Sequence, residues 1–190
     1  MPVAEAGTRS LTDAELLLLG LVAEMPRHAY ELEREIERRG LREWTRIGFS
    51  SVYFVLRKLE RAGLVKAKKP AGSKARKTFS ATRAGRAVLG EQTLAALGTW
   101  QPTHPSLLLG MLHWQAVRHG EAVEALDVRL RAVDAERARL ERMQAEQQPL
   151  PDFAEAVFDY SIGQLEAEAD WIGRTLDYMR TKPRLEEVDG

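Results

Sequence analysis

The residues best suited to chemistry are the cations of one short segment, SSVYFVLRKLERAGLV, which spans residues 50–65. At about 100° per residue, this segment predicts a helix with one apolar side, made of Val52, Val55, Leu56, Leu59 and Ala62. The other side carries an aromatic ring among cations, and it comprises Phe54, Arg57, Lys58 and Arg61, with Tyr53 at its edge. Guanidinium groups bind guanine edges and phosphates, and a ring can lie against a thymine methyl group. That side therefore suits the major groove of DNA.

Serine hydroxyls and a run of lysines extend this character on both sides of the segment. Ser50 and Ser51 stand at the helix start, where hydroxyls and free backbone amides commonly hold a phosphate. Six cations follow within twelve residues, with no acid between them: Lys66, Lys68, Lys69, Lys74, Arg76 and Lys77. Such a stretch can neutralise phosphates, and binding would then weaken steeply with salt. The alternative is that these cations only meet solvent and that Phe54 packs under the hairpin.

Other chemistry has little support in the sequence. No cysteine is present, which removes disulfides, zinc-thiolate sites and cysteine nucleophiles. The histidines, at positions 28, 104, 113 and 119, form no closely spaced pair with the carboxylate support that a metal site needs. Neither a Gly-Lys-Ser phosphate loop, nor a Gly-x-Ser-x-Gly elbow, nor a His-Glu-x-x-His motif occurs. We therefore expect no catalytic residue, no metal, no cofactor and no enzyme activity.

The formal net charge of zero hides two oppositely charged halves. Residues 1–90 carry 18 Lys and Arg against 10 Asp and Glu, and residues 91–190 carry 10 against 18. This segregation favours a polyanion as the partner of the first half, although domains of unequal charge also occur without nucleic acid.

Two predicted helices precede the basic segment. Thr12 and Glu15 have the spacing of a capping box, so a first helix runs from there to about Met25. The second helix, HAYELEREIERRG, ends at Gly40, which is a good stop signal. Its spacing places four residues on an inner surface, namely Ala29, Tyr30, Leu32 and Ile36.

A hairpin follows the third helix, which is expected to stop at Gly63. Apolar and polar residues alternate over 64–68, a returning strand is expected at 77–80, and Pro-Ala-Gly-Ser at 70–73 supplies the turn. Three helices followed by a basic hairpin make the order of a winged helix-turn-helix domain.

The remainder of the chain is predicted to be helical. A helix leads out of the domain from Thr82, and Pro102 to Pro105 mark a hinge. The segment SLLLGMLHWQAVRHG predicts a helix that ends at Gly120. The long helix after it has apolar residues at heptad-like spacing: Val123, Leu126, Leu130, Val133 and Leu140. The last helix, which starts after Pro151, carries Phe153, Val157, Tyr160, Gln164, Trp171 and Tyr178 at broadly helical spacing.

We thus expect a mostly α fold with an N-terminal winged helix-turn-helix and an all-helical C-terminal dimerisation domain. The expected parts are a flexible tail (1–10), a DNA-binding domain (11–90), a linker helix and hinge (91–104), a dimerisation domain (105–182) and a C-terminal tail (183–190). The longest apolar run, Leu16 to Ala23, is too short to cross a bilayer, and the amino terminus shows no secretory signal. A cytoplasmic protein without a membrane partner is expected.

The motifs of the first ninety residues resemble the DNA-binding domain of the PadR family of bacterial transcriptional regulators. That family has a leucine-rich first helix, a His-Gly-Tyr-Glu-Leu motif and a recognition helix of the form Gly-Ser-Leu-Tyr-x-x-Leu-x-x-Leu-Glu-x-x-Gly-Leu-Val. Here they correspond to LLLLGLVAEMPRHAYELEREI and SSVYFVLRKLERAGLV, with ATRAGRAVL as the later Thr-x-x-Gly motif. The departures are Ala29 and Ser50 for glycines and Phe54 for a frequent proline, and the last two put the operator sequence in doubt. The second half, with LEAEADWIGRTL, resembles the longer PadR subfamily.

The resemblance implies a homodimer that is held by its C-terminal helices and presents two winged domains to a pseudo-palindromic operator, usually as a repressor. The heptad-spaced residues Val123, Leu126, Leu130, Val133 and Leu140 agree with this, because an exposed apolar stripe must be covered and an identical partner is its commonest cover. Packing of all the C-terminal helices within one chain is the alternative.

The resemblance also implies a response to a small aromatic or cationic compound near the dimer interface. Trp114 and Trp171 are the candidates for such an effector site, since flat rings stack on planar ligands. Aromatic residues on helices are more often core. A different function is a winged-helix module that binds protein, with its acidic half as the functional surface.

Overall fold

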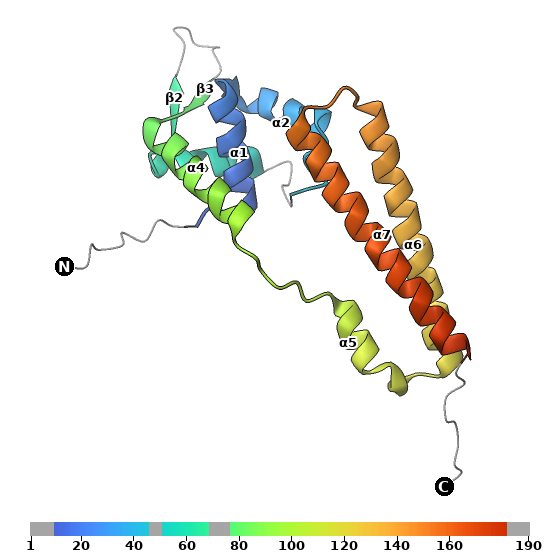
Figure 1. The fold of residues 1–190 in the computed structure, drawn as a ribbon. Coiled ribbons are helices and arrows are strands. Elements are labelled where there is room, and N and C mark those ends of the chain that lie inside the picture. Colours follow the sequence, from blue (N-terminus) through green and yellow to red (C-terminus); the bar gives the residue numbers. More distant parts are fainter. Residues whose placement is uncertain (1–9, 46–50, 69–76, 182–190) are drawn as a thin grey trace, which may run out of the picture. The chain divides into compact units, whose positions relative to one another are not determined.

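The computed structural model describes residues 10–45, 51–68 and 77–181, and the chain divides into two compact units, Met1–Gln101 and Pro102–Gly190 (Figure 1). Sequence-based assignments at residues 1–9, 46–50, 69–76 and 182–190 lie outside the described residues. Each unit has its own hydrophobic core, and each is considered by itself.

The first unit combines helices with a small sheet. Its elements are α1 (Asp13–Glu24), β1 (Arg27–His28), α2 (Ala29–Arg38), α3 (Ser51–Arg61), β2 (Val65–Lys68), β3 (Thr78–Ala81) and α4 (Arg83–Gly98). The sheet is antiparallel with the order β1-β3-β2, so the returning strand of the hairpin lies in its centre. This is the winged helix-turn-helix arrangement that the sequence predicted.

Local signals explain where these elements begin and end. The Thr12 hydroxyl accepts from the Glu15 backbone N–H at 3.3 Å, and the Glu15 carboxylate accepts from the Thr12 N–H at 3.0 Å, which completes the predicted capping box. Gly40 and Gly63 have φ angles of 61° and 71°, a backbone conformation that glycine adopts without a steric penalty, after the ends of α2 and α3. Both stop signals are confirmed.

The core of this unit gathers around α1, whose Leu18, Leu19 and Val22 are fully buried. Apolar residues of α2, α3 and β3 pack on the same cluster, including Leu32, Ile36, Leu56, Leu59 and Phe79. Two predicted inward residues are in fact exposed: Tyr30, at 51%, and Ala62. Both follow from helix geometry, because Tyr30 precedes the buried Leu32 by only two positions and Ala62 lies just beyond the last residue of α3.

The strand β1 was not predicted from the sequence. It consists of only two residues, Arg27 and His28, whose Cα atoms pair with Phe79 and Thr78 of β3. Two residues are too few to show an alternation of apolar and polar side chains, so the sequence gives no signal for this strand. It forms because the edge of β3 offers hydrogen-bonding partners.

The second unit consists of helices in the described residues 102–181, and they are α5 (Ser106–Leu112), a 3-10 turn (Trp114–Ala116), α6 (His119–Glu146) and α7 (Asp152–Thr181). The predicted helix end at Gly120 is wrong. Gly120 lies inside the first turn of α6, which begins at His119 and not at Glu121. The Glu121 carboxylate accepts from the Arg118 backbone N–H at 3.0 Å, and this contact caps the helix at Arg118.

The long helices α6 and α7 pack side by side and antiparallel (Figure 1). Arg129 pairs with Glu168 at 2.5 Å, and Arg180 pairs with Asp127 at 2.7 Å. Leu126 and Val133 of α6 lie in one cluster with residues of α7, which are Ile172, Leu176 and Met179. Within the chain, α7 therefore covers Leu126 and Val133, as in the alternative that the sequence left open, and the assignment of this stripe to a dimer interface stays a prediction.

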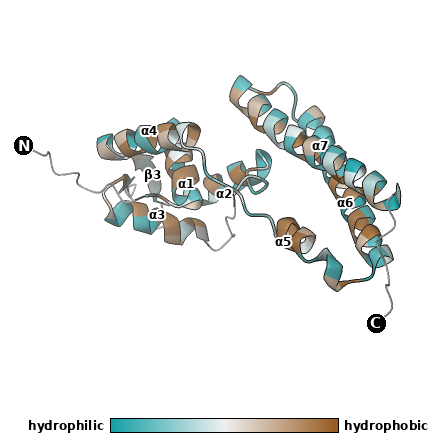
Figure 2. Cartoon of the chain, turned by 60° about the horizontal axis from the view of Figure 1, so that its bottom comes forward, coloured by the Kyte–Doolittle hydropathy of each residue, from teal (hydrophilic) through white to brown (hydrophobic). Residues whose placement is uncertain are grey.

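No helix among residues 10–45, 51–68 and 77–181 has the length and apolar character that a bilayer crossing requires. Short apolar stretches are present instead, and Figure 2 shows α5 as mostly hydrophobic. Its Leu109 and Leu112 are exposed.

Candidate nucleic-acid interface

The helix α3 divides its side chains between core and solvent as its sequence pattern predicts. Val52, Leu56 and Leu59 are fully buried against α1 and α2. The opposite side is open: Tyr53 and Phe54 are 56% and 65% exposed, and Arg57 and Arg61 are exposed as well. Burying a phenylalanine side chain is worth about 1.5–3 kcal/mol relative to leaving it in solvent, and the exposed Phe54 gains this only when a partner covers it. At this exposure, Phe54 is not buried under the described strands of the hairpin, residues 65–68 and 78–81.

The cations of this surface differ in how they are held. Within the described residues, neither Arg57 nor Arg61 forms an ion pair, so both guanidinium groups remain available to a partner. Lys58 is different, because its Nζ lies 3.0 Å from Oε1 of Glu15, a residue of α1 that is 1% exposed. By its angle Lys58 lies between the two sides of α3, and the buried carboxylate draws its ammonium group toward α1. Its predicted contact with the groove stays a prediction.

The wing contributes cations at its described ends. Lys68 closes β2 and pairs with Thr78 of β3, and both Lys68 and Lys77 are exposed. Ser51 is the first residue of α3. The remaining predicted DNA contacts, Ser50, Lys69, Lys74 and Arg76, lie outside the described residues.

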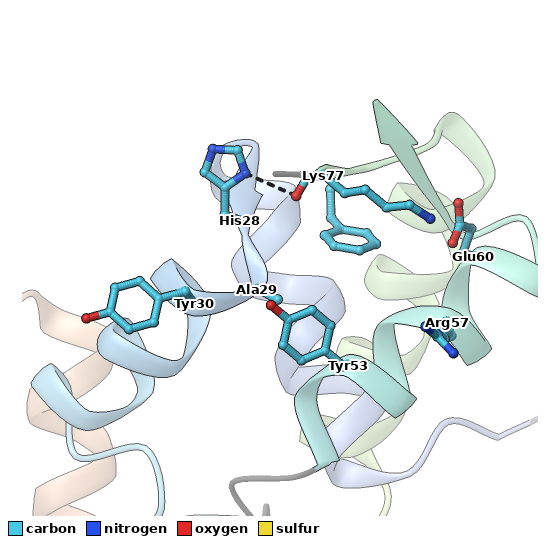
Figure 3. Close-up of a pocket in the computed structure, with 8 residues that line it drawn as sticks. His28, Ala29, Tyr30, Tyr53, Arg57, Glu60 and Lys77 are labelled. Atoms are coloured by element: carbon cyan, nitrogen blue, oxygen red, sulfur yellow. Dashed lines mark hydrogen bonds between the residues drawn. The ribbon is translucent and has the colours of Figure 1, made fainter. Parts of the chain in front are cut away.

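A cavity of about 190 Å³ lies where the start of α2, the helix α3 and the base of the wing meet. Its walls include His28 and Tyr30 from the helix-turn-helix, Tyr53 and Arg57 from α3, and Lys77 from the wing. Figure 3 shows the Lys77 side chain running toward Glu60 of α3, and the Tyr53 ring beside Ala29. Phenol, guanidinium and ammonium groups thus converge at one place, and such groups bind phosphate oxygens.

Two contacts that the sequence analysis did not identify fix the base of the wing. The Thr82 hydroxyl donates to the Gly63 carbonyl oxygen at 2.7 Å and accepts from the Gly85 backbone N–H at 3.0 Å. The helix α4 approaches so closely here that a Cβ atom at Gly85 would lie 2.0 Å from the carbonyl oxygen of Leu64. The Thr-x-x-Gly spacing was the available signal, since a hydroxyl cap followed by a tightly packed glycine needs that order.

Ion pairs hold α2 against the end of α1, away from the core. Glu24 of α1 binds Arg39 at 2.8 Å, and Glu35 binds Arg38 at 2.6 Å and also contacts Arg39. The hydrogen bond from Arg38 is the main cause that lowers the pKa of Glu35 to about 2. Arg39 therefore ties the end of α2 to α1, whereas the pair of Arg38 with Glu35 lies within α2.

The second unit contains a cavity of about 420 Å³ between α5, the 3-10 turn and the start of α6. Trp114, one of the two tryptophans that the sequence analysis selected, lines it together with Leu107, Met111 and Leu126. Trp171 does not line this cavity, although both tryptophans pack against the cluster between α6 and α7. The Arg129 guanidinium reaches the cavity but is bound to Glu168, so it presents no unbalanced charge there.

The described residues contain no group of three His, Asp or Glu side chains placed to hold a metal ion.

Comparison with known proteins places this geometry in context. Residues 18–91 match the family model of the transcriptional regulator PadR-like family. No curated protein has a significantly matching sequence. Among solved structures, Bacillus subtilis PadR in complex with operator DNA is 17% identical, has a TM-score of 0.68 and matches over 87% of this chain and 98% of its own.

Two further structures show the same fold. Bacillus subtilis PadR in complex with p-coumaric acid is 18% identical, with a TM-score of 0.71 over 87% of this chain and 98% of its own. The Vibrio cholerae virulence activator AphA is 18% identical, with a TM-score of 0.71 over 89% of this chain and 99% of its own.

Proposed function

Since residues 18–91 match the family model of the PadR-like transcriptional regulators, we propose that this chain is a homodimeric regulator that binds a pseudo-palindromic DNA operator. The observation that supports this most directly is the free side of α3. Its Phe54, Arg57 and Arg61 are exposed, and no ion pair within the described residues occupies either guanidinium group.

The proposed recognition follows from the position of these groups. The core holds α3 by its apolar side, so Arg57 and Arg61 can enter a major groove and meet guanine edges, while Phe54 can contact a thymine methyl group. Lys68 and Lys77 at the wing base would hold backbone phosphates, which fixes the register of α3 without reading sequence.

Fluorescence anisotropy with duplex DNA at several salt concentrations tests this proposal. Selection of bound sequences from random duplexes would supply the operator. Arg57→Glu should weaken binding at least tenfold, because a contact to guanine is lost and a repulsive charge is added. Arg142→Glu, at an exposed position of α6, changes the net charge equally and should bind as the wild type does. Equal binding by Arg57→Glu and the wild type would refute the role of α3.

The sign of regulation belongs to the same proposal. Repression requires the operator to overlap a promoter, and a reporter placed behind the selected operator should become more active when the gene is deleted. AphA is described as an activator, so a fall in reporter activity would reverse the proposed sign and leave the DNA-binding proposal intact.

The homodimer is proposed to form through α7. Because α7 already covers the apolar stripe of α6, the uncovered apolar side chains lie elsewhere. Phe153, Val157 and Tyr160 of α7 are exposed at positions that recur on one side of a helix. A second copy of the same stripe would cover them by twofold symmetry.

Sedimentation tests the dimer. The full chain should sediment as a dimer, Tyr160→Asp should shift it toward monomer, and a fragment of residues 1–105 should be monomeric. Asp159→Ala, at the neighbouring position of α7, is the control that should remain dimeric. A dimeric 1–105 fragment would refute assembly through the second unit.

A small planar effector is proposed for the cavity beside Trp114. Its volume of about 420 Å³ falls within the range of ligand sites, and its walls are mostly apolar. Because Arg129 is bound to Glu168, an uncharged ligand should bind better than an anion. Quenching of tryptophan fluorescence by p-coumaric acid and by its methyl ester measures this, with Trp114→Phe as the variant that should lose the signal. Stronger quenching by the acid would refute the assignment.

The second candidate function is a winged-helix module that binds protein. The surplus of acids in residues 91–190, 18 against 10 basic residues, favours it. Retention on duplex DNA at low salt, released as salt rises, supports the first function, whereas a wild-type chain that is not retained supports the second.

A further inference from the structure

His28 joins three elements at the edge of the cavity between the helix-turn-helix and the wing. It is the last residue of β1 and directly precedes α2, and its Cα pairs with that of Thr78 in β3. Its backbone N–H donates to the Glu31 carboxylate at 2.7 Å. The Glu31 carboxylate thus holds the backbone of His28, while the imidazole ring makes a separate contact.

The ring makes that contact with the main chain of the wing. Nδ1 lies 3.0 Å from the carbonyl oxygen of Lys77, the bond drawn as a dashed line in Figure 3, and 3.2 Å from Oγ1 of Thr78. A carbonyl oxygen can only accept, so the bond to Lys77 requires the proton on Nδ1. The imidazole thus ties the start of α2 to the residue at which the wing returns to the sheet.

The position of this bond gives it a consequence for DNA binding. The pairing of β1 with β3 covers only two residues on each strand, which alone holds two strands weakly. Lys77 is exposed and lines the same cavity as Arg57 and Tyr53 of the recognition helix. Where the Lys77 main chain enters the sheet therefore decides how far its ammonium group lies from α3.

We propose that His28 is a positioning residue for DNA binding, which acts by holding the Lys77 main chain beside the recognition helix. This inference rests on the proposed function. His28 does not contact DNA in this arrangement; its ring orders a wing cation before binding, so the phosphate contact costs less conformational entropy.

Two amide variants of His28 test the bond itself. In His28→Asn the side-chain NH₂ takes the place of Nδ1 and can donate to the Lys77 carbonyl oxygen, whereas in His28→Gln it takes the place of Nε2 and cannot. Anisotropy with the selected duplex should show binding within twofold of the wild type for Asn. For Gln and for His28→Ala, binding should weaken roughly three- to tenfold, the value of one hydrogen bond. For these two variants, the slope of log affinity against log salt concentration should be shallower than that of the wild type by about 0.9, the value of one phosphate contact.

The comparison of Asn with Gln separates positioning from general damage. Both are neutral amides, and their Tm values show how far the better N-cap propensity of Asn at the start of α2 stabilises the fold. Equal binding by the two variants would overturn the inference, and so would a loss of affinity in Gln without a loss of salt slope. Thermal unfolding identifies a variant that fails to fold, and if His28→Ala does so the Asn and Gln pair still decides. A wild-type chain that binds no duplex would refute the proposed function itself and this inference with it.

Discussion

Replacement of Lys58 by methionine should cost stability rather than DNA recognition. Its Nζ lies 3.0 Å from Oε1 of Glu15, which is 1% exposed, while the Lys58 side chain is 37% exposed. Breaking a buried ion pair costs about 3–5 kcal/mol, and breaking an exposed pair costs about 0–1 kcal/mol. The half-exposed lysine keeps part of its hydration, so we expect a loss of about 2–3 kcal/mol, between those limits.

Thermal unfolding followed by circular dichroism measures this loss. In a domain of 60–100 residues, a change of 1 kcal/mol shifts Tm by about 4–8 °C, so Lys58→Met should lower the Tm of the first unit by roughly 10–20 °C. The double variant Glu15→Gln with Lys58→Met should be more stable than Lys58→Met alone, because the neutral amide leaves no unbalanced charge in the core.

DNA binding supplies the opposing result. At a temperature where Lys58→Met is folded, its affinity for the selected duplex should fall much less than that of Arg57→Glu. An unchanged Tm together with an affinity as low as that of Arg57→Glu would show that Lys58 faces the groove, and the ion pair with Glu15 would then be irrelevant.

Three further results are expected. Gly85→Ala should destabilise the first unit by more than about 3 kcal/mol in thermal unfolding, since its Cβ would lie 2.0 Å from the Leu64 carbonyl oxygen, whereas Gly90→Ala, with open space around it on the same helix, should stabilise by about 0.5–1 kcal/mol. A chain in which both are tolerated would contradict the close approach of α4. The pKa of Glu35 is lowered from 4.5 to about 2, so its contribution to stability is present above pH 4.5 and is lost as the pH falls toward 2; Glu35→Gln should flatten the acid limb of stability against pH, and an unchanged limb would count against the contact with Arg38. Lys77→Ala should reduce the salt slope of DNA binding by about 0.9, and a change at Lys66→Ala but not at Lys77→Ala would place the phosphate contact elsewhere on the wing.

Much of the candidate interface could be predicted because its signals are local. The capping box at Thr12, the glycines at 40 and 63 and the apolar period of α3 each act within a few residues of the chain, and the structure shows all three. Local periodicity also separated the buried side of α3 from Phe54 and Arg57. What it determined is which side of a helix faces the core.

Periodicity does not determine which neighbouring element covers a given side of a helix. Only the tertiary structure shows this. The sequence shows an apolar stripe on α6, but only packing reveals that α7 of the same chain covers Leu126 and Val133. Likewise, the helical spacing of α3 groups Lys58 with the exposed cations, whereas in the structure its ammonium group binds the buried Glu15, forty-three positions earlier in the chain. The bond from His28 to Lys77 has the same origin, since its partners are 49 residues apart and a two-residue strand brings them together. Long-range contacts of this kind leave no period in the sequence, because they depend on where whole elements lie and not on the spacing within one of them.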